Sequence, residues 1–178
     1  MSHFAALVVR SNDHWKSSDI DDLDLVSLDD IEDVADLMRD ACGDDGSSVL
    51  FVEEDDEWFG IVRVDAGGEP KAFISDARVV PTSELAAVLF GDVVPESLAE
   101  QAKDLLALDD DEAAEVDDED RGATPAAEPA GANDLLADFG ISGSALLAMC
   151  AEEGALPADV ITSVCERLGC VDEIEVYR

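Results

Sequence analysis

The chain has 178 residues, which is long enough for one domain with a hydrophobic core and an appended segment. It carries 45 Asp and Glu residues against 10 Lys and Arg residues, a formal net charge of -35 at pH 7. Binding to phosphate backbones or anionic lipids normally depends on Lys and Arg displacing counterions, so this balance predicts no direct nucleic-acid binding and no membrane partner. The charge would attract a partner with a basic surface. The alternative reading is that the acidity serves solubility or belongs to a generally acidic proteome.

The ends and the cysteines indicate a compartment. The first residues, MSHFAALVVR, have no basic head and no small-residue cleavage site, so we expect no secretory signal. The chain contains no run of about 18 apolar residues, the length that spans a bilayer. Its cysteines lie among apolar neighbours and are expected to be buried thiols rather than disulfide partners; they are Cys42, Cys150, Cys165 and Cys170. The prediction is a soluble, cytoplasmic protein.

The first structural unit is predicted to be a β-hairpin. Residues 4–9 form an almost continuous apolar run, as in a strand covered on both faces. The turn cluster Ser-Asn-Asp at 11–13 follows, and residues 15–20 can return as a second strand. Residues 19–25 are acidic and expected to be loop.

An amphipathic helix follows the hairpin. Ser27 is the predicted cap, with Asp30 three residues later in a weak form of the capping box. Acidic residues in the first turn suit the positive end of the helix dipole, and Gly43 is the expected stop. Apolar residues recur three and four apart on one face, at Leu28, Ile31, Ala35, Met38 and Cys42.

Residues 49–74 read as a three-stranded meander, the element around which the rest of the chain is predicted to be arranged. Its apolar strands, 49–52, 58–64 and 71–75, are separated by the turn clusters EEDDE and AGGEP. Alternation in the second strand predicts that both of its faces are covered. Gly60 leaves a gap that a cross-strand aromatic side chain is expected to fill.

A short helix after Pro81 completes the first part, with Thr82 or Ser83 as its cap and Gly91 at its end. The element order is then ββαβββα. That order predicts an α+β fold, a single antiparallel sheet with its helices packed on it, analogous to the longin and roadblock modules.

The second half changes character at Asp109. We predict an α+β sheet domain over 1–108, whose last helix covers 95–108, then an acidic, Ala- and Pro-rich disordered linker over 109–132. Residues 133–178 are predicted to form a small helical segment. Its helices are expected from Asn133 to Gly140, from Ser142 to near Gly154 and from Pro157 to Gly169, with a short turn after Cys170. This segment is near the lower limit for independent folding, so docking on the sheet or on a partner both stay open.

The residues that chemistry normally requires do not converge in the sequence. His3 and His14 start no H-x-E pattern, and there is no C-x-x-C pair and no phosphate-binding glycine loop. Carboxylates are so abundant that pairing among them carries no signal. We therefore predict no catalytic residue, no cofactor and no metal, and a protein that is not an enzyme. An unrecognised enzyme that uses carboxylates and a metal is the less favoured alternative.

One stretch is a candidate protein-interaction site. Trp58 and Phe59 follow the acidic turn residues Asp55, Asp56 and Glu57, as an aromatic anchor beside a charged rim would. Against this, aromatic residues in strands are usually part of the core, and burial statistics favour that alternative for both.

Several segments resemble the tRNA adenosine deaminase-associated proteins of actinobacteria. They are FAALVVR, DDIEDVADLMRDA, EDDEWFGIVRVD, FISDA and DLLADFGIS. The resemblance spans both predicted folded portions, and it implies association with a deaminase that converts adenosine to inosine in tRNA. It implies no activity, cofactor or catalytic residue of the chain itself.

The leading functional hypothesis is a non-catalytic acidic accessory protein that binds a basic protein partner, a tRNA adenosine deaminase, and modulates it. The alternative from a different class is a structural module that forms a homodimer through an exposed strand or helix of a longin-like sheet.

Overall fold

A computed structural model of the chain describes residues 3–12, 14–18, 25, 28–43, 46–94, 127–152 and 154–175. The predicted helix over 95–108 and most of the predicted linker lie outside the described residues, as does Ser27.

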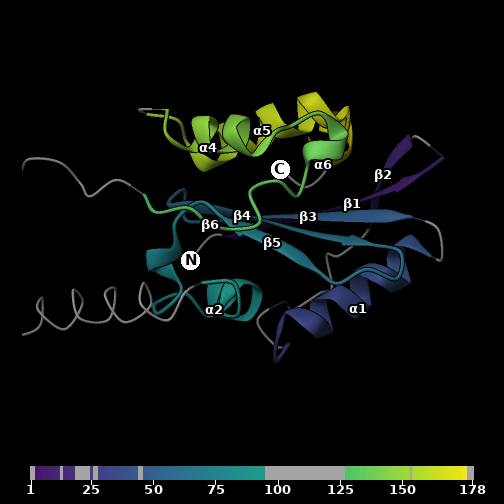
Figure 1. The fold of residues 1–178 in the computed structure, drawn as a ribbon, viewed down its shortest axis with the longest axis horizontal. Helices are drawn as coiled ribbons and strands as arrows, with labels where there is room; N and C mark the ends of the chain where they lie inside the picture. The colour runs from purple at the N-terminus through teal and green to yellow at the C-terminus, as the bar shows by residue number, and fades with distance from the viewer. Residues whose placement is uncertain are drawn as a thin grey trace, which may run out of the picture.

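The centre of the molecule is a six-stranded sheet with the order β2-β1-β3-β4-β5-β6 (Figure 1). Every neighbouring pair is antiparallel, which confirms the predicted α+β class with one antiparallel sheet. The strands are β1 (His3–Ser11), β2 (His14–Ser18), β3 (Ser47–Glu54), β4 (Trp58–Asp65), β5 (Lys71–Ile74) and β6 (Ala130–Gly131).

Helices cover both faces of this sheet, so the molecule has three layers (Figure 1). On one face lie α1 (Ile31–Cys42) and α2 (Glu84–Phe90). On the other lie α4 (Gly143–Cys150), α5 (Pro157–Leu168) and α6 (Val171–Glu175). The chain also contains short 3₁₀ helices: η2 (Ala77–Val79) lies between β5 and α2, and η3 (Ala137–Phe139) lies between β6 and α4. No helix in the described part of the chain is long and apolar enough to cross a bilayer.

The hairpin and α1 form where the sequence predicts them. Asn12, in the β1–β2 turn, has a left-handed φ of 50°, a conformation that asparagine tolerates better than most residues. The cap of α1 differs from the prediction, because Asp30 rather than Ser27 occupies that position. Its carboxylate accepts hydrogen bonds from the backbone nitrogens of Glu32 and Asp33 at 3.0 and 3.1 Å. Aspartate is among the best cap residues, and the apolar face of the helix is buried from its first residue, Ile31.

Both faces of β4 are buried, as its composition predicts. Trp58, Val62 and Val64 pack in the core under α1 and α2, while Phe59 and Ile61 pack in the core under the C-terminal helices. The gap at Gly60 is filled by an aromatic ring, but the ring belongs to Phe90 of α2 and not to a neighbouring strand. A helix that lies across the sheet can place a ring end directly over a strand, which a neighbour in the same sheet does less easily.

The C-terminal residues contact the sheet in two ways, by pairing as an edge strand and by packing helices on one face. Ala130 and Gly131, which the sequence assigns to the linker, pair with Ile74 and Phe73 as strand β6. The predicted helix from Asn133 to Gly140 does not form: residues 133–136 are turns and only Ala137–Phe139 are helical, as η3, which ends at Gly140 with a left-handed φ of 90°. The Leu135 carbonyl accepts a hydrogen bond from Arg63 of the sheet. The helices that follow, α4, α5 and α6, form as predicted and bury their apolar faces against the sheet.

Candidate interaction surface

The acidic β3–β4 turn is an exposed tip at the end of the hairpin. Asp55 and Asp56 adopt left-handed conformations with φ 52° and 58°, and the backbone N–H of Glu57 donates to the carbonyl of Glu54 at 3.0 Å. Short polar residues accept this conformation more readily than apolar ones, so the turn suits its sequence. All three side chains, those of Asp55, Asp56 and Glu57, are exposed.

The two aromatic residues beside the tip are buried on opposite faces of the sheet. Trp58 is 1% exposed; its ring meets Phe90 edge to face at 5.9 Å, and its Nε1 donates to Glu54 Oε2 at 3.2 Å. Phe59 is 2% exposed and lies 6.2 Å from the Phe73 ring. The predicted candidate set is therefore divided: the aromatic residues belong to the two cores, and the tip presents only its carboxylates.

A shallow hollow lies next to the tip, under the turn that joins α4 and α5. It has a volume of about 100 Å³. The residues that line it come from the β3–β4 hairpin, from the segments after β5 and before β6, and from the α4–α5 region; they are Glu57, Phe59, Ser75, Ala127, Cys150, Ala155, Pro157 and Val160. A larger open hollow of about 330 Å³ adjoins it and shares Ala155 and Val160; its other lining residues are Met149, Glu152, Gly154, Asp159 and Ser163.

Leu156 lies on the α4–α5 turn, between Ala155 and Pro157 in the chain, and is 51% exposed. It occupies the N-cap position of α5, where it makes no side-chain hydrogen bond. Capping positions strongly favour Ser, Thr, Asp or Asn, and large aliphatic residues are disfavoured there. The sequence analysis missed this residue, although a leucine directly before the Pro157 that opens a helix was a readable signal.

Cys150 contributes a thiol to the smaller hollow. Its burial raises the pKa of the thiol to about 11. Because only the thiolate is an effective nucleophile or metal ligand, Cys150 is an inert lining residue at neutral pH.

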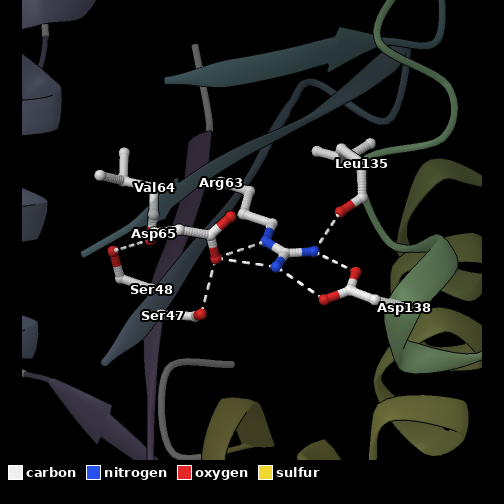
Figure 2. Close-up of polar contacts among 7 residues, drawn as sticks. All are labelled: Ser47, Ser48, Arg63, Val64, Asp65, Leu135 and Asp138. Carbon is white, nitrogen blue, oxygen red and sulfur yellow. Dashed lines mark hydrogen bonds and ion pairs between the residues drawn. The ribbon is translucent and has the colours of Figure 1, made fainter. Parts of the chain in front are cut away.

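A polar network surrounds Arg63 on β4, away from the two hollows (Figure 2). Its guanidinium donates from Nε and Nη2 to one oxygen of Asp65 at 2.9 and 2.8 Å, and from both Nη atoms to the carboxylate of Asp138. Nη1 also donates to the Leu135 carbonyl at 2.6 Å. The hydrogen bond with Arg63 holds the pKa of the Asp138 carboxyl below its usual value. This network joins the sheet to the turn that carries the C-terminal helices.

An aromatic stack extends the same network. The Phe139 ring lies between two guanidinium groups, with the Arg63 carbon 4.3 Å and the Arg10 carbon 4.9 Å from its centroid. The Trp15 ring meets Phe139 edge to face at 5.3 Å. All three guanidinium nitrogens of Arg63 donate to Asp65, Asp138 or Leu135, so this arrangement is suited to holding η3 on the sheet.

Within the described ranges, no three His, Cys, Asp or Glu side chains come together in a way that could hold a metal ion. His3 and His14 lie exposed on the first two strands. Among the described residues, the features that can serve an interaction include the acidic tip, the two hollows and Leu156.

Comparison with known proteins identifies the family. A family model described as Rv3753c-like tRNA adenosine deaminase-associated protein matches residues 3–171. The chain belongs to this family. The match runs from β1 to the start of α6, so it includes the sheet and the C-terminal helices and confirms the resemblance found in the sequence. The family name records association with a tRNA adenosine deaminase. No curated protein matches the chain, and no solved structure does.

Proposed function

We propose that this protein is a non-catalytic accessory protein that binds a tRNA adenosine deaminase and modulates its access to tRNA. The observation that carries the proposal is membership of a family named for association with that enzyme. The net charge of -35 supports it, because an enzyme that acts on tRNA needs a basic surface for the phosphates. A strongly acidic protein is complementary to the same surface.

The distribution of the carboxylates is compatible with fast, long-range association. Exposed acidic side chains lie on the α1 layer, at Glu32, Asp33 and Asp36, as well as at the β3–β4 tip. Charges of one sign spread over a small protein raise the rate at which an oppositely charged partner is captured. We place this encounter in the cytoplasm, because Cys42, Cys150 and Cys170 are free thiols, as expected in a reducing compartment.

The test is to mix the purified protein with the purified tRNA adenosine deaminase of the same organism, at roughly 0.05 M and roughly 0.5 M salt, across which screening of exposed charges increases strongly. We expect a complex by analytical ultracentrifugation at low salt and a weaker one at high salt. Deamination of tRNA should show a changed KM for tRNA as the acidic protein is added. An unrelated monomeric protein of equal net charge is the control for nonspecific attraction. The absence of a complex at both salt concentrations would refute the proposal.

A further inference from the structure

We propose that the surface between the β3–β4 tip and the α4–α5 turn is the docking groove for the partner, and that it receives a basic segment with an aliphatic side chain between its lysines or arginines. We call this surface the tip groove and define it by Glu57, Glu152, Ala155, Leu156, Pro157 and Asp159. The inference rests on the proposed function and names the part of the molecule that carries it.

The apolar part of the tip groove is continuous. The two hollows meet at Ala155 and Val160, and Phe59, Met149 and Pro157 add further apolar lining. A single exposed leucine is ordinary on a protein surface. Here Leu156 is the one large hydrophobic side chain that is exposed among the described residues. It follows Ala155, which lines both hollows, and precedes Pro157, which lines the smaller one. An aliphatic side chain from a partner would bury Leu156 and fill the adjoining space.

The rim of the tip groove is acidic. Glu57 lines the smaller hollow, and Glu152 and Asp159 line the larger one, and all three are exposed. The residues described as lining the two hollows include no Lys, Arg or His. Interfaces commonly combine an apolar centre with a charged rim that selects the partner, so this rim selects a cationic segment.

Charge also decides against the other possible occupants. A second copy of this chain would bring a further net charge of -35 to an acidic rim. The acidic stretch of the chain itself at 109–120, DDDEAAEVDDED, would be repelled for the same reason. A Lys- or Arg-bearing segment is the occupant that both the rim and the apolar centre favour.

The experiment compares variants in binding to the purified tRNA adenosine deaminase, measured by biolayer interferometry at low salt. One variant neutralises the rim with Glu57→Gln, Glu152→Gln and Asp159→Asn, and a second carries Leu156→Asp. We expect each to weaken binding by about tenfold or more, the size typical of a residue or charge set at the centre of an interface. Leu156→Ala should give a smaller loss in the same direction.

The matched control neutralises three exposed carboxylates at the opposite edge of the same layer, with Glu166→Gln, Asp172→Asn and Glu175→Gln. These belong to α5 and α6, and α6 packs beside β1 and β2. The control has the same net charge as the rim variant, so a loss below about twofold assigns the effect to position rather than to total charge.

The outcomes separate the two proposals. If the unaltered protein binds the deaminase and the rim, Leu156 and control variants all bind equally well, the tip groove is refuted while the proposed function stands. If the unaltered protein does not bind, the proposed function fails and the groove assignment fails with it. Self-association in light scattering that Leu156→Asp abolishes would show that the occupant is a second copy, which also overturns the inference. Thermal unfolding of each variant confirms that a loss of binding is not a loss of fold.

Discussion

Arg63 shows how one charged residue can be accommodated inside an otherwise apolar sheet. Its side chain is 8% exposed, and its guanidinium reaches outward to Asp65 and Asp138 while its stem crosses the core face of β4. Planar guanidinium groups match carboxylates with paired hydrogen bonds, and the Phe139 ring covers the remaining face. The residue therefore fixes the position of η3, on which the path of the C-terminal helices depends.

The carboxylate of Asp138 makes this contact dependent on pH. Its pKa is lowered in the folded protein, first by the hydrogen bond from Arg63. The contribution to stability is therefore fully present above the pKa of an unfolded aspartate, and it is lost as the pH falls through the lower folded pKa. We predict that Asp138→Asn lowers the free energy of unfolding at pH 7 by about 1 kcal/mol or less, because a side chain that is 57% exposed is screened by solvent.

The measurement is urea unfolding of both proteins at neutral pH and at acid pH. The difference between them should shrink as the pH falls below about 4, where an unfolded aspartate begins to protonate, and disappear once the pH is below the lower folded pKa of Asp138. Asp134→Asn, an exposed change in the same turn, is the control and should have little effect at either pH. A difference that stays constant down to acid pH would contradict the assignment.

Among the elements, α2 is positioned by the absence of a side chain on β4. A Cβ atom at Gly60 would lie 2.1 Å from the Phe90 ring, far inside van der Waals contact. The ring therefore occupies the place of a side chain on the strand and also meets Trp58 edge to face. The glycine is required by this close approach of a helix and a strand, because its backbone conformation is ordinary for a β-strand.

Gly60→Ala is expected to destabilise the protein by about 1–3 kcal/mol, the usual cost of overpacking a core. Adding Phe90→Leu should recover part of the loss, since the shorter side chain makes room for the methyl group. Gly68→Ala is the matched control: its nearest neighbour would be at an ordinary 3.4 Å, so we expect a change within about 0.5 kcal/mol. Chemical denaturation measures these three variants and Phe90→Leu alone, which completes the comparison. Independent, additive effects of the two core substitutions would contradict the packing described here.

At the scale of the whole molecule, the C-terminal layer completes the core of the sheet. The second core contains sheet residues such as Phe51, Phe59 and Phe73 together with Ile161 and Val164 of α5. Without residues 127–178, this apolar face of the sheet would lie open to water. Large exposed apolar faces drive association, so the two parts of the chain are expected to depend on each other for folding.

We predict that a chain ending at residue 126 binds a hydrophobic dye and aggregates, whereas the full chain unfolds in one cooperative transition. Size-exclusion chromatography and calorimetry measure both properties. The control is the full chain with a protease site introduced within residues 95–126 and then cleaved there. The two fragments should stay associated, because the core between the sheet and the C-terminal helices holds them together. A truncated chain that remains monomeric and unfolds cooperatively would show that the first part is an independent domain.

Most of the strands and helices could be predicted from the sequence alone, because apolar periodicity, caps and turn residues act over a few positions. The alternation of side chains in residues 58–64 predicted strand β4, and the recurrence of apolar residues every three to four positions predicted α1. The glycines that follow α1 and α5 predicted where these two helices end. The resemblance of short segments also predicted the family, and the charge predicted the type of partner that we propose.

Only the tertiary structure decided which of these elements meet. Three contacts join residues that are far apart in the chain. They are the pairing of Ala130 and Gly131 with β5, the packing of the Phe90 ring over Gly60, and the ion pair of Arg63 with Asp138. Nothing in the local pattern specifies such pairs, because side-chain packing fixes them only when the layers assemble. For the same reason the exposure of Leu156 on the α4–α5 turn became clear only in the structure, whereas the burial of Trp58 and Phe59 was the alternative that the sequence favoured.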